Sequence, residues 1–175
     1  MVVDWYIVLF RIIHIASAIL WFGAAVFYSA FVGPTLQSAG AEGGRLFNHL
    51  VRQQKAVIFF VVVSTSTVVA GAFLYWRDSG GLDADFMQTG FGTGLTVGAV
   101  AGLLSWFLVL LVLAPTSYRL AALGEQISAL ERPPSQEQMA SLRALQSRLN
   151  GFSIVNIASL GIATVAMATA RYLNF

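Results

Sequence analysis

Four long apolar stretches, nearly free of charge, constrain this chain more than any other feature of its sequence. They cover about 5–31, 56–76, 93–114 and 151–172. A helix needs about 20 mostly apolar residues to cross the hydrocarbon core of a bilayer. A helix also satisfies its own backbone hydrogen bonds, which makes it the default spanning structure in lipid. The sequence therefore predicts an all-α membrane protein built as a bundle of four transmembrane helices in one domain.

The composition indicates that lipid, rather than water, surrounds much of the chain. Apolar types make up 57% of the 175 residues and charged types 10%, whereas a soluble domain carries about 25% charged residues. A net charge of +2, with no basic run that interleaves aromatic residues, argues against nucleic acid as a partner. The absence of cysteine excludes thiolate metal sites and iron–sulfur clusters. The expected partner is the bilayer, and a second copy or the subunits of a membrane complex are further candidates.

Lysine and arginine residues gather in two of the three connecting segments. Positively charged loops stay on the cytoplasmic side of a membrane. This bias predicts a multi-pass protein of the inner (plasma) membrane with both termini outside, in the periplasm or the extracellular space. The residues concerned are Arg45, Arg52 and Lys55 between the first and second spans, and Arg119, Arg132, Arg143 and Arg148 between the third and fourth.

The two connections on the expected cytoplasmic side have different patterns. Residues 34–54 begin at a Gly-Pro pair and contain several glycines, which predicts a loop with one short interfacial helix over about 46–52. Residues 116–150 carry two apolar helical stripes separated by Pro133-Pro134, and Ser135 with Gln138 matches a capping box. This segment predicts a helical hairpin, either a self-packed stalk or a docking site for a partner or a second copy.

Small residues on the spans predict where the helices pack against one another. Helices in lipid associate through close backbone approach at such positions. The expected packing residues are Gly94, Gly98 and Gly102 on the third span, Ala158, Gly161, Ala163, Ala166 and Ala170 on the fourth, and Ser64, Ser66, Thr67 and Gly71 on the second.

Few polar residues lie within the spans, and each is a functional candidate because placing it in lipid is costly. The first span contains Arg11 and His14, which are three residues apart and share one helical face, and Trp21 follows on that face. Asn156, in the inner third of the fourth span, is expected to form hydrogen bonds between helices. No known catalytic motif is present, so the sequence names no catalytic residue and leaves open whether the protein is an enzyme.

His14 is compatible with three roles. It can be a neutral imidazole that forms hydrogen bonds within the bundle, an axial ligand of haem iron, or a ligand for copper or a carrier of protons. Arg11 would then either extend to the outer interface or pair with an anion such as a haem propionate. The only other histidine, His49, lies at the cytoplasmic entrance to the second span, whereas the inner end of the first span is already roughly 25 Å from His14. The two cannot bind one iron, and His49 is expected to be an interfacial loop residue.

One part of the first span resembles a known family. The run Arg11-Ile-Ile-His14, then Trp21-Phe22-Gly23, then Phe27-Tyr28 resembles the opening helix of the copper-resistance-D superfamily, which includes the bacterial membrane protoporphyrinogen oxidase of the HemJ type. In that oxidase the first-helix histidine is associated with b-type haem. The resemblance therefore implies haem b on His14, which would be the metal ligand, with Arg11 and Trp21 beside the cofactor.

The rest of the chain adds less to this resemblance. The stretch Arg148-Leu149-Asn150, with Asn156, resembles a branch of integral membrane proteins without an assigned activity. The oxidase has a lysine in a later helix, and the third span here has none. Copper-transporting members often add methionine or histidine ligands, whereas Met167 is the only methionine within the four spans.

Three functions follow as hypotheses from the sequence. The first is a b-haem protein or subunit that serves redox chemistry or electron transfer. The second is a non-enzymatic accessory or assembly subunit of a membrane complex. The third is a carrier of copper or of a small solute.

Overall fold

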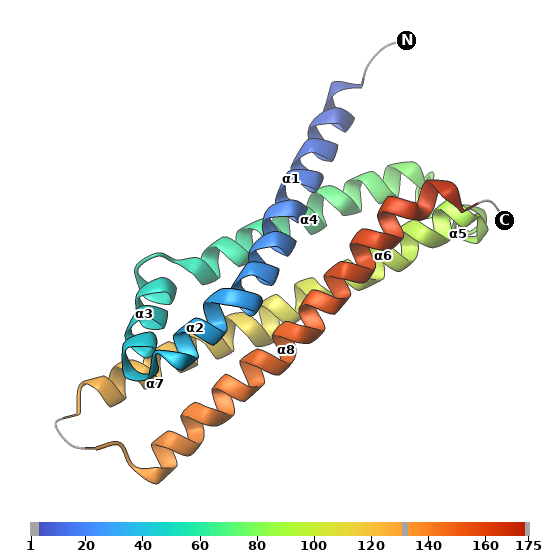
Figure 1. Cartoon of the computed structure of the whole chain (residues 1–175). Coiled ribbons are helices and arrows are strands. Elements are labelled where there is room, and N and C mark those ends of the chain that lie inside the picture. Colours follow the sequence, from blue (N-terminus) through green and yellow to red (C-terminus); the bar gives the residue numbers. More distant parts are fainter. Residues whose placement is uncertain (1–3, 131–132, 174–175) are drawn as a thin grey trace.

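The computed structural model describes residues 4–130 and 133–173, which form helices joined by short turns and contain no strand (Figure 1). The predicted all-α fold is confirmed. Four long helical rods make up the bundle, and two shorter helices, α3 (Gly40–Arg52) and α5 (Ala84–Gln88), connect them. The rods are α1 (Trp5–Phe27) with the π-helical turn η1 (Tyr28–Val32) and α2 (Gly33–Ser38); α4 (Ala56–Asp78); α6 (Gly90–Leu108) with the π-helical turn η2 (Val109–Leu113) and α7 (Ala114–Ser128); and α8 (Gln136–Thr169) with η3 (Ala170–Tyr172).

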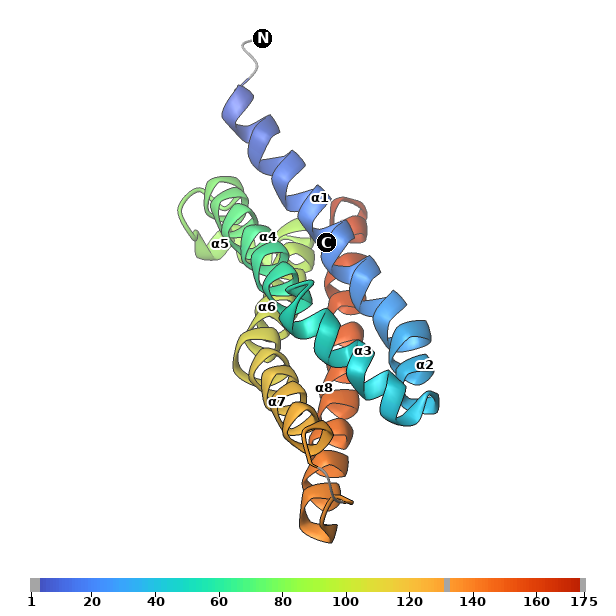
Figure 2. The same cartoon turned by 90° about the vertical axis from the view of Figure 1, so that its left-hand side faces the viewer.

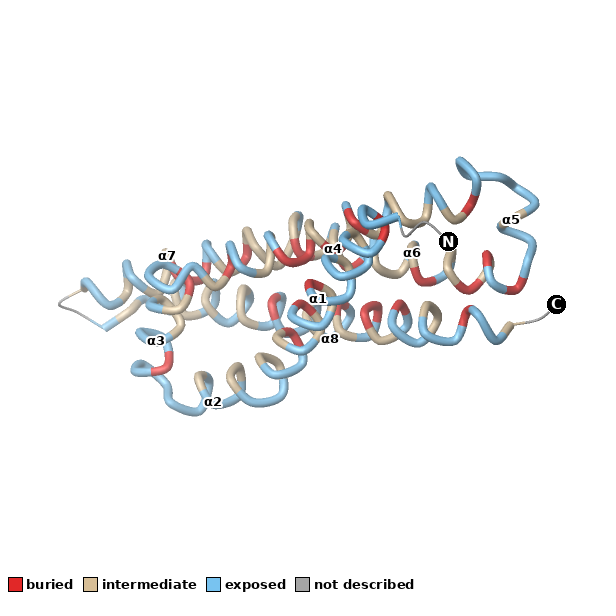
Figure 3. Tube along the Cα trace, turned by 90° about the horizontal axis from the view of Figure 1, so that it is seen from above, coloured by how far each residue is buried: buried red, intermediate tan, exposed pale blue. Residues whose placement is uncertain are grey.

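All four rods are long and apolar enough to cross a membrane. Their outer faces expose large apolar side chains, including Leu111 and Ile154, each 68% exposed, and buried positions lie along the inner faces (Figure 3). Exposing apolar surface to water costs about 25 cal/mol per Å², so these faces belong in lipid. The chain is therefore a multi-pass membrane protein.

The bundle consists of two helix pairs. α1 packs on α4, and α6 packs on α8, while narrower contacts between α4 and α6 and between α1 and α8 join the pairs. Both described ends of the chain lie at the same end of the bundle as α5, which we call the terminal end; α2, α3, α7 and the start of α8 lie at the opposite, hairpin end (Figures 1 and 2). The first turns of α1 diverge from α8 toward the terminal end (Figures 1 and 2).

Hydrogen bonds between polar side chains hold the pairs together inside the apolar bundle. Trp106 of α6 donates its Nε1–H to Thr65 Oγ1 of α4 at 3.1 Å. Nearer the terminal end, the hydroxyls of Tyr75 and Thr96 lie 2.6 Å apart and join the same two helices. Bonds of this kind between membrane helices contribute about 0.6 kcal/mol on average, so they help to fix the register of α4 on α6 rather than dominate stability.

Two rods contain a π-helical turn directly before a proline. η1 precedes Gly33-Pro34, and η2 precedes Ala114-Pro115. Proline has no N–H to donate, and its ring clashes with the carbonyl four residues earlier. A π-helical turn holds one more residue than an α-helical turn, which gives the ring room. Each rod therefore continues past its proline instead of ending there.

The short helix predicted within 34–54 is present as part of α3, but the loop predicted around it is wrong, because the segment is mostly helical. α2 continues the first rod to Ser38, and α3 starts at Gly40, where a positive φ of 56° reverses the chain. At Gly43, a Cβ atom would overlap the carbonyl of Leu36. These glycines thus form a tight turn between two helices rather than an open loop.

The hairpin over 116–150 is confirmed, with boundaries that differ from those predicted. Its first arm, α7, is continuous with α6, and its second arm is the first part of α8, so no break separates the hairpin from the membrane spans. α7 packs on both α8 and α3, and Arg52 of α3 lies 3.5 Å from Glu125 of α7. The hairpin is therefore braced by α3 as well as packed on itself. Arg132, which contributes to the predicted charge bias, lies outside the described residues.

The predicted capping box at the start of α8 is confirmed. Ser135 Oγ accepts a hydrogen bond from Gln138 N at 3.2 Å, and Gln138 Oε1 accepts one from Ser135 N at 2.9 Å. We expect Ser135→Ala to destabilise this end of the helix by about 1 kcal/mol. The measurement is faster amide hydrogen exchange over 136–139. Ser141→Ala, at an exposed position further along α8, should leave exchange unchanged, and equal rates in the two variants would contradict the assigned cap.

The α6–α8 contact confirms the predicted glycine face at two positions and corrects it at a third. A Cβ at Gly94 would lie 2.8 Å from Ala170 Cβ, and one at Gly98 would lie 2.5 Å from Met167 Cγ. At Gly102 nothing lies within 4 Å. A four-residue step advances about 40° around a helix of 3.6 residues per turn, so Gly102 has rotated out of the contact.

The fourth span shows the same mixture of buried and exposed small residues. Ala163 and Ala170 are buried against α6, as predicted, whereas Ala158 is exposed. At Gly161 a Cβ would meet nothing within 4 Å. The prediction is therefore wrong for Ala158 and Gly161 as close-packing positions, because both face away from the helix that α8 contacts.

Candidate functional site

His14 lies where α1 crosses α4, with its ring half-buried between the two helices. Its Nδ1 atom is 2.8 Å from the backbone carbonyl oxygen of Thr67. A carbonyl oxygen can only accept a hydrogen bond, so Nδ1 carries the proton and donates. In a neutral imidazole the other nitrogen, Nε2, then holds the free lone pair.

Gly71 provides the space that the His14 ring occupies. A Cβ atom at this position would lie 2.7 Å from His14 Cε1 and 2.9 Å from His14 Nδ1, closer than a real Cβ approaches. Gly71 is one turn beyond Thr67 on the same face of α4. The two residues together form a seat for the imidazole, with a carbonyl that orients it and a glycine that admits it. The packing role predicted for Gly71 is thus a contact with the His14 side chain rather than with the backbone of another helix.

Two buried hydroxyls extend this polar cluster. Thr67 Oγ1 lies 2.9 Å from Ser17 Oγ and 2.8 Å from the Val63 carbonyl, and Ser17 Oγ donates to the Ile13 carbonyl at 2.6 Å. All these groups are therefore satisfied inside the bundle, which is what a stable polar cluster in lipid requires. Ser17 was not predicted as part of the site, although its position three residues after His14 places it on the same helical face.

Arg11 points toward the terminal end of the bundle and stays largely exposed. Its Nη2 atom lies 3.9 Å from Asp78 Oδ2, and its side chain is 61% exposed. Asp78 is also 3.2 Å from Arg77, which lies 3.7 Å from Asp4. Exposed ion pairs contribute about 0–1 kcal/mol, so this network holds Arg11 loosely.

Trp21 lies in the apolar centre of the bundle, and its side chain forms no hydrogen bond with the α1–α4 polar cluster. It is 1% exposed and packs with Ala25, Val63, Val109 and Leu160. Its Nε1–H has no hydrogen-bond partner within the described ranges. Trp21 therefore shares the helical face of His14 but contributes mainly to the apolar core.

His49 and Asn156 lie away from His14. His49 is exposed on α3, and its Nε2 is 3.2 Å from the Gln54 side-chain amide; it is a helical residue rather than the loop residue predicted. Asn156 Oδ1 accepts a hydrogen bond from Ser105 Oγ of α6 at 2.6 Å, which is the interhelical role predicted for it.

Over 4–130 and 133–173, no group of three or more histidine, aspartate or glutamate side chains could hold a metal ion.

Comparisons of the chain with protein-family models, with curated proteins and with solved structures find no match. Similarity therefore assigns no family, and the resemblance of the first span to the copper-resistance-D superfamily stays an expectation.

Proposed function

We propose that this membrane protein binds b-type haem through His14 and serves electron transfer, either alone or as the redox subunit of a complex. The observation that carries the proposal is the hydrogen bond from His14 Nδ1–H to the Thr67 carbonyl at 2.8 Å. Histidines that bind metals commonly donate their second ring N–H to a carbonyl or carboxylate, which fixes the tautomer and raises the basicity of the ligating nitrogen. His14 has this arrangement within a membrane span.

The histidines of the chain would supply a haem near His14 with one imidazole ligand. His49 is on α3, beyond the hairpin end of the first rod, so His14 is the single imidazole available to a haem at this depth. Proximal ligation by one histidine is a common haem arrangement.

Arg11 supplies the positive charge that the propionates of a haem require. It is one turn from His14, toward the terminal end, and its ion pair with Asp78 is long, at 3.9 Å. A planar guanidinium binds carboxylates through two parallel hydrogen bonds. In this arrangement Thr67 orients the imidazole, Gly71 admits it and Arg11 binds a propionate; the bound haem supplies one-electron redox chemistry.

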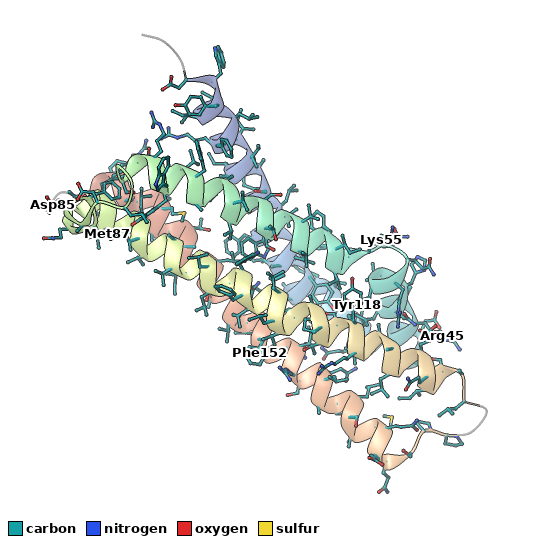
Figure 4. All side chains as sticks on the ribbon, turned by 180° about the vertical axis from the view of Figure 1, so that it is seen from behind. Arg45, Lys55, Asp85, Met87, Tyr118 and Phe152 are labelled. Carbon is teal, nitrogen blue, oxygen red and sulfur yellow. The ribbon has the colours of Figure 1, made fainter. Side chains whose placement is uncertain are left out.

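The charge distribution supports an orientation in which the hairpin end is cytoplasmic and both termini are outside. Arg45 and Lys55 lie at the hairpin end, and Asp85 lies at the terminal end beside Met87 (Figure 4). Positive residues close to the ends of spans mark the cytoplasmic side. The inner membrane is then the expected location, and the haem would lie in the outer half of the bilayer.

The test is the visible absorption spectrum of the purified full-length protein. We expect a Soret band that is present in wild type, lost in His14→Ala and unchanged in His49→Ala, which removes the other histidine. A wild-type preparation that is colourless and remains so after haem is added would refute the proposal, as would an intact Soret band in folded His14→Ala.

A further inference from the structure

A cavity of about 290 Å³ lies between the two helix pairs, in the half of the bundle nearer the hairpin end. Residues from α1, η1, α3, α4, η2, α7 and α8 all contribute to its walls. Its volume is just below the range of about 300–1,000 Å³ that small-molecule sites occupy. It is separate from the seat of His14, since neither His14, Thr67 nor Gly71 lines it.

The walls of the cavity are apolar and aromatic and carry no charge. Four phenylalanines line it, Phe27, Phe47, Phe59 and Phe60, and among the described residues no lysine, arginine, aspartate or glutamate does. Aromatic rings pack favourably against other flat rings, and burying a net charge without a partner is costly. These walls therefore suit a neutral molecule with a flat ring.

Apolar walls alone cannot select a ligand within a membrane, because lipid tails are as apolar as the walls. Selection has to come from polar groups, and Asn156 provides one. It is 3% exposed and lines the cavity, and its Oδ1 atom accepts the hydrogen bond from Ser105. Its amide nitrogen donates no hydrogen bond to the part of the chain that the structure describes. An unpaired donor in an apolar site costs about 1–3 kcal/mol, so an occupant with an acceptor oxygen is favoured.

Four hydroxyls on the walls add to this set of donors. Tyr28, Ser29, Ser117 and Ser153 line the cavity, and none forms a side-chain hydrogen bond within residues 4–130 and 133–173. By contrast, Ser17 and Thr164, elsewhere on the same spans, donate to the carbonyl four residues earlier. A hydroxyl that does not bond to its own helix can bind a ligand oxygen.

The two π-helical turns meet at this cavity. Tyr28 is the first residue of η1 and Val109 is the first residue of η2, and both line the walls. π-helical turns are rare and frequent at functional sites. Ligand sites in membrane bundles built from two helical halves also lie where the halves meet. The turns thus shape the cavity as well as accommodating the prolines.

We propose that this cavity binds a neutral, flat, lipid-soluble carbonyl compound of the quinone class, with the Asn156 amide donating to a carbonyl oxygen. Such a molecule matches the three features of the site: the uncharged walls, the aromatic lining and the donors that lack acceptors. The inference does not rest on haem binding, because no residue of the His14 seat takes part in it.

The test is calorimetric titration of the detergent-solubilised full-length protein with menadione, using 2-methylnaphthalene as a ligand of similar shape without carbonyl oxygens. We expect Asn156→Leu to weaken menadione binding by about three- to tenfold, the value of one hydrogen bond, and to leave 2-methylnaphthalene binding unchanged. Ala24→Phe, at a lining position, should abolish the binding of both compounds. Ala168→Phe, at an exposed position on α8, should bind both as wild type does.

Three outcomes would overturn the proposal. Wild-type binding by Ala24→Phe would place the site elsewhere. Equal affinity of wild type and Asn156→Leu for menadione would remove the carbonyl recognition. A co-purifying phospholipid that menadione does not displace would identify an acyl chain as the occupant. His14→Ala should bind menadione as wild type does, so the result is independent of the haem proposal.

Discussion

If His14 holds haem as proposed above, replacing Gly71 with valine is expected to abolish haem binding as completely as replacing His14 itself. A Cβ at position 71 would lie 2.7 Å from His14 Cε1 and 2.9 Å from His14 Nδ1. The imidazole must then leave its seat, or α1 and α4 must separate. Either change breaks the hydrogen bond from His14 Nδ1–H to the Thr67 carbonyl. That hydrogen bond keeps the proton on Nδ1 and so leaves the lone pair of Nε2 free to bind iron. The measurement is the Soret absorbance per mole of purified protein, which should fall to the level of His14→Ala.

The matched control is Ala72→Val, at the next position of α4. This position is exposed, so the added methyl groups contact lipid and the Soret band should be unchanged. Thermal unfolding of both variants separates loss of haem from loss of fold. A folded Gly71→Val protein with a full Soret band would show that the imidazole seated against Gly71 is not the ligand.

The spans and the hairpin could be predicted because their signals are local. Length and hydropathy are read from each stretch alone, and all four predicted spans lie within the four apolar rods. The capping box is equally local, since Ser135 and Gln138 are three residues apart and satisfy each other's backbone. No contact between distant parts of the chain is needed for either prediction.

The segment after the first span was mispredicted because two local signals compete there. Gly33-Pro34 usually marks the end of a helix, yet proline is also well tolerated in the first turn of one. In the structure the helix continues past Pro34, and the π-helical turn η1 accommodates the proline ring. The third rod does the same at Ala114-Pro115. Nothing in the residues around either proline reveals the π-helical turn in advance.

The candidate site could be predicted only on one of its two helices. Arg11, His14 and Trp21 share a face of the first span, but the sequence does not fix which part of the second span faces them. Thr67 and Gly71 contact His14 from more than 50 residues away. The register of α1 on α4 depends on how the side chains of both helices pack against each other. The same holds for Trp21. The sequence correctly places it on the helical face of His14, but does not predict that it packs in the apolar core.

The close contact between α6 and α8 gives the second large expected effect. At Gly94, an added Cβ would lie 2.8 Å from Ala170 Cβ and 2.9 Å from Ala170 Cα. Because a Cα atom cannot turn aside as a flexible side chain can, Gly94→Leu must push the two helices apart. Overpacking of a tight interior costs about 1–3 kcal/mol and occasionally more, and here the displaced partner is backbone. We expect a loss of about 3 kcal/mol in the free energy of unfolding.

Gly102→Leu is a matched control for Gly94→Leu, because it also replaces a glycine of α6 with leucine. An added Cβ there would meet nothing within 4 Å, and leucine favours a helix over glycine by roughly 0.8 kcal/mol. This variant should therefore unfold at or slightly above the wild-type denaturant midpoint, while Gly94→Leu unfolds well below it. Circular dichroism during unfolding in mixed micelles measures both midpoints. Equal losses in the two variants would mean that helix propensity or lipid contact, rather than backbone approach at Ala170, governs the α6–α8 interface.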